Sequence, residues 1–156
     1  MKKSNNITFD DGKREYLINN DENRKIYVDS ADYGILNRVN EAEENIAKYM
    51  KRYENVEIRA DGSAAMDDEK AIEEVKNIGN YVREQIDYIF NAKVSDVVFD
   101  GANPLSTRKG VPLYERFLIA FVPIIQADFE EETAEAKKRI EKYQKQAERF
   151  KNKVAR

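Results

Sequence analysis

Residues able to carry out chemistry are scarce in this chain. Its 156 residues include neither His nor Cys, so the usual general base near neutral pH, the commonest metal ligand and the thiol nucleophile are all missing. Carboxylates remain, and Asp67, Asp68 and Glu69 form a consecutive group. Consecutive helical residues point in different directions, however, and acidic residues suit the first turn of a helix. We therefore predict no catalytic, cofactor-binding or metal-binding residues.

Two further segments resemble ligand sites, and each has a simpler interpretation. Asp10-Asp11-Gly12 lacks the later ligands of a calcium-binding EF-hand loop, so it is interpreted as a hairpin turn. The run from Ser106 to Lys109 has the composition of a phosphate-binding patch but reads as a solvated loop. No Gly-rich dinucleotide motif, Walker loop or nucleophile elbow is present. The sequence therefore indicates a protein that is not an enzyme.

Composition bounds the class of protein. Hydrophobic residues make up 41% of the chain and charged residues 37%, which is typical of long helices that bury only one narrow face. No run approaches 18 apolar residues, so we expect no membrane span. The start, MKKSNNITFDDG, lacks the apolar core of a secretory signal. Together these features predict a cytoplasmic protein.

Charge is distributed unevenly along the chain. Residues 133–156 contain nine Lys or Arg and three Glu, a local net charge of +6, which leaves −9 for the preceding residues. A basic segment of this kind can neutralise phosphates of nucleic acid. No aromatic stacking pattern or known nucleic-acid-binding motif accompanies it, and positive charge also suits the C-terminal end of a helix. Binding to nucleic acid is therefore not the expected function.

The first thirty residues predict a small antiparallel β meander over residues 6–28. The apolar segments Ile7–Phe9, Tyr16–Ile18 and Ile26–Val28 are rich in β-branched and aromatic residues and are separated by Asp-Gly and Asn-rich turns. A sheet this small needs a helix against one face. We therefore expect a helical layer behind it.

Three long helices are predicted after the meander, over about residues 32–54, 66–90 and 112–129. Apolar residues recur at three- and four-residue spacing in each. Between the second and third, Val94–Phe99 is predicted to be a short helix or an apolar turn, and Asn103–Gly110 a polar loop. Pro123 should kink the last helix or split it near Phe121. The predicted fold class is α+β and mostly α, with residues 1–129 forming one domain.

Residues 130–156 are predicted to form a charged helical extension. Its apolar side chains follow Phe129 in steps of alternately four and three residues, the spacing of a heptad-like stripe. The stripe comprises Phe129, Thr133, Ala136, Ile140, Tyr143, Ala147, Phe150 and Val154. Such a helix can lie along the chain's own helices, pair with another subunit or fray.

The dense apolar block from Ile86 to Phe129 supplies most of the predicted core. Its last part, beyond Pro123, adds apolar surface to a thin set of helices, and an exposed apolar patch marks an interface. We therefore predict a partner-binding surface made by the end of this block and the extension. It comprises Ile124, Ile125, Phe129, Ile140, Tyr143 and Phe150.

The order of these parts resembles the tail assembly chaperones of tailed phages and prophages of Gram-positive bacteria. The resemblance rests on the short β start, the charged middle helices and two stretches: REQIDYIFNAKVSDVVFDGANPL at 83–105 and VPLYERFLIAFVPIIQ at 111–126. The Lys/Arg-rich C-terminal helix continues it. The pattern covers most of the chain.

The resemblance implies a non-enzymatic protein that coats the tape measure protein and keeps it soluble until the tail tube forms. Such a chaperone acts in the host bacterial cytoplasm, is absent from the mature virion and forms homo-oligomers, and no cofactor is implied. Two alternatives remain open. One is a connector or tail-completion protein that stays in the particle, and the other is a small nucleic-acid-binding regulator that uses the basic extension.

Overall fold

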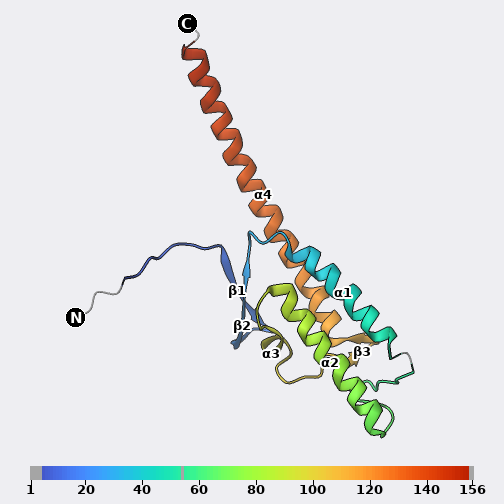
Figure 1. The fold of residues 1–156 in the computed structure, drawn as a ribbon. Coiled ribbons are helices and arrows are strands. Elements are labelled where there is room, and N and C mark those ends of the chain that lie inside the picture. Colours follow the sequence, from blue (N-terminus) through green and yellow to red (C-terminus); the bar gives the residue numbers. More distant parts are fainter. Residues whose placement is uncertain (1–4, 54, 155–156) are drawn as a thin grey trace, which may run out of the picture.

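A computed structural model describes residues 5–53 and 55–154, with side chains up to residue 149. It is an α+β fold, mostly helical, which confirms the predicted class. Within these residues, two small two-stranded sheets and four helices make a compact body. An N-terminal arm and the outer half of the last helix project from this body in different directions (Figure 1).

The N-terminal hairpin consists of strands β1 (Lys13–Ile18) and β2 (Asp21–Asp29), paired antiparallel. Asn19 and Asn20 connect them with φ angles of 51° and 60°, the left-handed conformation that a tight type I′ turn requires. Tyr16 lies opposite Ile26 in the register. The inner face of the hairpin is therefore apolar at its centre, and it turns toward the helices.

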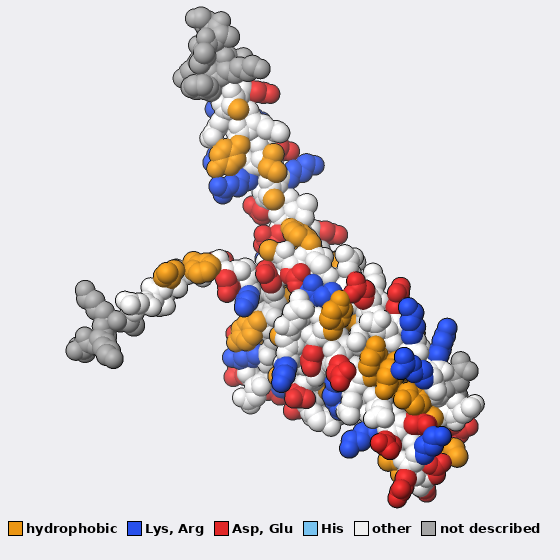
Figure 2. Space-filling model, in the orientation of Figure 1, with side chains coloured by type: hydrophobic (Ala, Val, Ile, Leu, Met, Phe, Trp, Pro, Cys, Tyr) orange, Lys and Arg blue, Asp and Glu red, His pale blue; other side chains and the backbone are white. Residues whose placement is uncertain are grey.

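The predicted three-stranded meander is wrong in one respect, because Ile7–Phe9 is not a strand. Ile7 and Phe9 are instead exposed on the extended arm (Figure 2). The Gly12 carbonyl accepts hydrogen bonds from the Ser30 amide and hydroxyl, both at 3.1 Å. These bonds fix the point at which the chain leaves the hairpin, and the arm continues away from β1 instead of folding back along it.

Helices α1 (Ile35–Lys51) and α2 (Glu69–Phe90) pack side by side behind the hairpin. The α2 N-terminus is capped by the Asp68 carboxylate, which accepts from the Ala71 amide at 3.1 Å. This confirms the structural interpretation of the acidic run at 67–69. The faces that meet supply much of the core. Its members on these helices are Ile35, Val39, Ala42, Ile46, Ala71, Val75, Ile78, Val82, Ile86 and Ile89.

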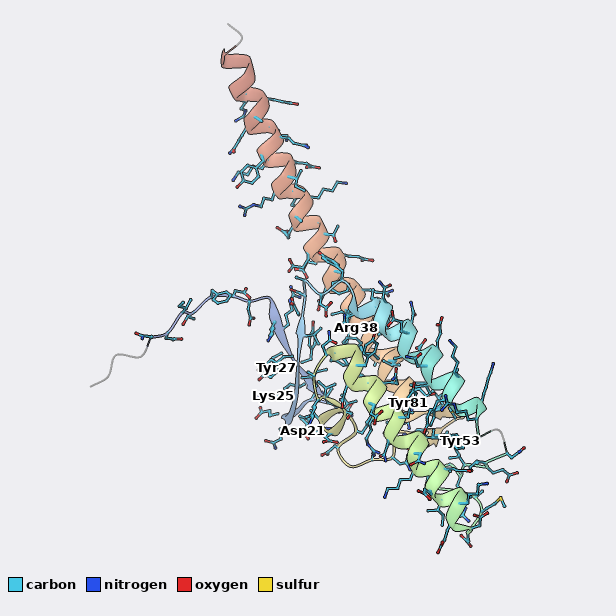
Figure 3. All side chains as sticks on the ribbon, in the orientation of Figure 1. Asp21, Lys25, Tyr27, Arg38, Tyr53 and Tyr81 are labelled. Carbon is cyan, nitrogen blue, oxygen red and sulfur yellow. The ribbon has the colours of Figure 1, made fainter. Side chains whose placement is uncertain are left out.

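Helix α1 begins later than the predicted residue 32. The Asp32 carboxylate pairs with the Arg38 guanidinium instead of capping the helix, and Gly34 is the N-cap without a side-chain hydrogen bond. Arg38 also donates to the Ile89 carbonyl at 2.8 Å, near the end of α2 (Figure 3). One arginine thus joins the start of α1 to the end of α2.

The segment after α2 forms a short helix, α3 (Ser95–Phe99). The Asp87 carboxylate on α2 accepts from the backbone amides of Val94 and Ser95 at 2.9 and 2.7 Å. At the other end, the Arg24 guanidinium on β2 donates to the Val97 and Val98 carbonyls at 3.0 and 2.6 Å. Both ends of α3 are therefore satisfied by charged side chains from neighbouring elements.

The predicted loop at 103–110 contains half of a second hairpin. Strands β3 (Thr107–Arg108) and β4 (Val111–Pro112) pair across Lys109 and Gly110, whose φ angles of 53° and 79° again fit a tight turn. The Leu113 amide then donates to the Ser106 carbonyl at 2.8 Å. This hairpin sets the point at which the last helix begins.

Helix α4 (Leu113–Val154) is one continuous helix through Pro123. Of the two predicted effects of Pro123, a kink or a split, the split is therefore wrong. Pro123 lacks an amide N–H and cannot bond to the Ile119 carbonyl, but the turns on both sides are held in the core by Phe121 and Ile125. No helix in the described ranges is long and apolar enough to cross a membrane.

Candidate functional site

The six residues predicted to bind a partner divide into three groups. Ile125 and Phe129 belong to the core, with exposed fractions of 0% and 7%, and the Phe129 ring packs 4.9 Å from that of Tyr33. Their prediction as free surface is wrong because they continue the core-facing stripe of α4 past Pro123. Ile124 does not belong to the core, and its side chain is 47% exposed.

The other three lie on the projecting part of α4. Ile140 and Tyr143 are exposed. The described part of the extension carries hydrophobic and basic side chains close together (Figure 2). Phe150 is on the same helix, but its side chain lies outside the described residues. The structure thus separates Ile124 on the body from the other two exposed residues on the extension.

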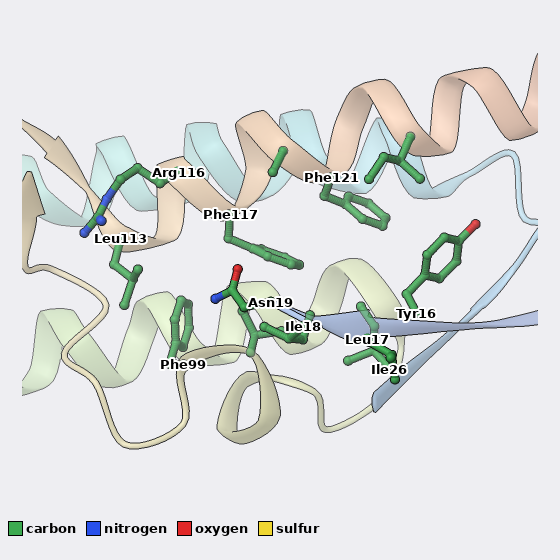
Figure 4. Close-up of a pocket in the computed structure, with 13 residues that line it drawn as sticks. Tyr16, Leu17, Ile18, Asn19, Ile26, Phe99, Leu113, Arg116, Phe117 and Phe121 are labelled. Carbon is green, nitrogen blue, oxygen red and sulfur yellow. The ribbon is translucent and has the colours of Figure 1, made fainter. Parts of the chain in front are cut away.

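An apolar groove of about 320 Å³ surrounds Ile124 on the body. It runs between the inner face of the β1–β2 hairpin, helix α3 and the first half of α4 (Figure 4). We call it the hairpin groove. Its lining residues are Tyr16, Leu17, Ile18, Asn19, Ile26, Val98, Phe99, Leu113, Arg116, Phe117, Ala120, Phe121 and Ile124.

One wall of the hairpin groove is aromatic. Phe117 and Phe121 are one helical turn apart on α4, their rings stack with centroids 5.8 Å apart, and Phe90 of α2 supports both from behind at 6.1 and 5.0 Å. Ile18 and Ile26 of the hairpin form the opposite wall (Figure 4). The walls are therefore held by core packing, and such a preformed apolar groove binds apolar side chains with little loss of its own entropy.

A single charged residue lines this groove, Arg116. Its guanidinium donates to the Ser106 carbonyl at 3.2 Å, but the buried Nε has no hydrogen-bond partner within the described ranges. A buried donor without an acceptor is costly. The groove therefore places one positive charge beside whatever occupies it.

The end of the groove nearest the arm is closed by polar contacts between β1 and α4. Tyr16 donates to the Asp128 carboxylate, and burial together with this carboxylate raises the pKa of the Tyr16 phenol to about 12. Arg14 bonds to the same carboxylate at 3.0 Å and to Glu132 at 3.2 Å. The Asp128 charge correspondingly raises the pKa of the Arg14 guanidinium. These contacts fix the spacing between the hairpin and α4.

Sequence reasoning found Ile124 but missed the groove as a whole. Phe117 and Phe121 lie in the apolar block that predicts the core, and they also form the groove wall. The available signal was their spacing, because Phe117, Phe121 and Ile124 follow each other by four and three residues on a face adjacent to the buried one. Nothing local indicated that the hairpin would lie opposite.

The arrangement has the features of a binding surface. No group of three or more His, Cys, Asp or Glu that could hold a metal occurs among the described residues. Comparison with protein-family models, curated proteins and solved structures finds no match.

Proposed function

We propose that this chain is a non-enzymatic tail assembly chaperone, of the kind its sequence resembles, and that the hairpin groove binds an apolar helical segment of the tape measure protein. The observation that carries the proposal is that groove. It leaves Phe117 and Leu17 partly accessible and Ile124 about half exposed on the body.

The chemistry of the groove fits an amphipathic helix as the bound segment. Aliphatic side chains at three- and four-residue spacing enter an apolar groove of this kind, while the polar face of the helix stays in water. Arg116 lies at the Leu113 end of the groove, where its positive charge suits a carboxylate of the bound segment. The charged surface of the body then keeps the complex soluble.

Co-expression with the tape measure protein of the same gene cluster tests this function. We expect this chain to raise the soluble fraction of the tape measure protein, and Ile124→Glu to abolish that gain because it places a carboxylate among apolar groove walls. Ile119→Glu is the matched control, since Ile119 is on the same helix, is 65% exposed and lies outside the groove.

The outcomes separate the proposal from its alternatives. An equally insoluble tape measure protein with and without this chain would overturn the chaperone function. If both variants lose the gain in soluble tape measure protein equally, the groove is not the binding site. The proposal is supported if Ile119→Glu retains the gain in soluble tape measure protein and Ile124→Glu loses it, with both variants folded by circular dichroism.

A further inference from the structure

The outer half of α4 has no partner within the part of the chain that the structure describes. Every residue from Thr133 to Arg149 is exposed, and the helix projects away from the body (Figure 1). Its side-chain bonds stay within the helix: Arg139 to the Tyr143 hydroxyl at 3.0 Å and Lys138 to Glu135 at 3.5 Å. Most of a helix's stability in proteins comes from packing of its apolar face, so a partner on this face would stabilise the extension.

The exposed apolar residues continue the face with which α4 packs on its own body. The buried residues Tyr114, Leu118, Phe121, Ile125 and Phe129 follow each other at three- or four-residue spacing. The same spacing continues through Thr133, Ala136, Ile140, Tyr143 and Ala147. Because α4 is continuous, this outer stripe cannot fold back onto its own body. The compact body of the same chain is therefore not its partner.

Charge along the extension changes sign within the helix. Residues 128–135 contain five acidic residues and no basic one, whereas residues 137–149 contain six basic and two acidic residues. Two extensions side by side in parallel would set like charges together and bring two acidic bodies to the same end. Two antiparallel extensions set the acidic part of each against the basic part of the other.

We propose that two copies of this chain pair through residues 130–154 as an antiparallel two-stranded coil with two-fold symmetry. The stripe fixes the register, with Ile140 of one copy opposite Tyr143 of the other and Ala136 opposite Ala147. In that register position 130 faces 151 and position 132 faces 153, an acid against a lysine in each case. The two bodies then sit at opposite ends, with both hairpin grooves free.

The first test is sedimentation of the full chain over a range of protein concentrations. We expect a monomer–dimer equilibrium that weakens as NaCl is raised, because the flanking charge pairs are exposed. Ile140→Asn should raise the dimer dissociation constant at least about tenfold, since the change occurs twice in each dimer. Ile119→Asn, at an exposed site on the same helix outside the stripe, should leave it unchanged.

Cysteine cross-linking tests the direction of pairing, and the chain has no native Cys to interfere. A mixture of Ala136→Cys and Ala147→Cys chains should form a disulfide-linked dimer. Ala136→Cys alone should not, because antiparallel pairing separates the two copies of residue 136 by eleven residues, about 16 Å along the axis.

Three other results would each overturn the proposal. If the chain is a monomer at all concentrations, it does not form the proposed dimer. A cross-link in Ala136→Cys alone shows that the pairing is parallel. If Ile140→Asn dimerises as well as the parent, the stripe is not the interface. None of these assays contains the tape measure protein, and Ile124→Glu should dimerise normally. A failure here is therefore distinguishable from a failure of the proposed chaperone function.

Discussion

The Tyr16 hydroxyl donates a hydrogen bond to the Asp128 carboxylate, which joins β1 to α4 across more than a hundred residues of sequence. The same carboxylate accepts from Arg14 at 3.0 Å, and its side chain is only 15% exposed. A single acidic residue thus holds two successive inward-facing side chains of the hairpin. Because α4 carries one wall of the groove and the hairpin the other, this contact sets the width between them.

The Tyr16–Asp128 contact predicts a loss of stability in alkali. Burial and the neighbouring carboxylate raise the folded-state pKa of Tyr16 from 10 to about 12, so the protonated phenol stabilises the fold. That stabilisation is complete below about pH 10 and is lost as the pH rises through about 12. Urea unfolding across this range should show the free energy of unfolding falling in the parent.

Tyr16→Phe isolates this contribution. At neutral pH the variant should be less stable by about 1 kcal/mol, because one hydrogen bond is lost while Arg14 still pairs with Asp128. Above pH 10 it should lose less stability than the parent, since the phenol is gone. If the free energies of unfolding of the variant and the parent fall in parallel through that range, the alkaline loss of stability does not come from Tyr16.

Ile124 and Ile125 are neighbours in sequence and should respond oppositely to truncation. Ile125 is fully buried, so Ile125→Ala should cost about 2–5 kcal/mol of the free energy of unfolding through lost burial and a cavity. Ile124→Ala should change it by no more than about 0.5 kcal/mol, because Ile124 lies on the accessible groove wall. Denaturant unfolding of the pair measures both, and equal costs would contradict the division of the stripe.

Gly62 should be intolerant of any side chain. Its φ of +86° is strained for other residues, and an added Cβ would meet the Asn103 side chain at 2.4 Å. The Asn103 side chain has little freedom to move, since its Oδ1 atom accepts a hydrogen bond from the Leu105 amide at 2.9 Å. Gly62→Ala should therefore destabilise the fold by about 2–3 kcal/mol, combining backbone strain and the clash.

Gly101 provides the matched control for this substitution. Its φ is +78°, yet an added Cβ would find no atom within 4 Å. Gly101→Ala should cost only the strain of the left-handed backbone, about 1 kcal/mol. Thermal or urea unfolding of both variants separates the two causes, and equal losses would mean that Asn103 moves aside.

The helices were predictable from sequence because their periodicity is local. The stripes of α1 and α2 contain the buried aliphatic residues of both helices, although Ile72 in the α2 stripe is 52% exposed. Asp68 caps α2, as an acid in that position should. The β start was predicted only in part, because strand propensity at Ile7 and Phe9 does not determine pairing. Ser30 donates hydrogen bonds to the carbonyl of Gly12, which lies eighteen residues earlier, and these bonds direct the arm away from β1.

The hairpin groove was not predictable, because its two walls are distant in sequence. Ile18 and Ile26 meet Phe117 and Phe121 only after the hairpin has docked on α4. The division between Ile124 and Ile125 was in principle readable, since Leu118, Phe121, Ile125 and Phe129 keep one periodic face. Expecting Pro123 to interrupt the helix obscured that continuity.

Mass spectrometry of purified phage particles tests whether the chain remains in the virion. A chaperone that occupies apolar segments of the tape measure protein should be displaced when the tail tube subunits cover those segments, because the same side chains cannot be buried twice. We therefore expect abundant tape measure and tube peptides in particles and none from this chain. The lysate before assembly is the positive control, in which its peptides should be present. Stoichiometric recovery from particles would instead favour a connector or tail-completion protein, with the groove acting as a permanent interface.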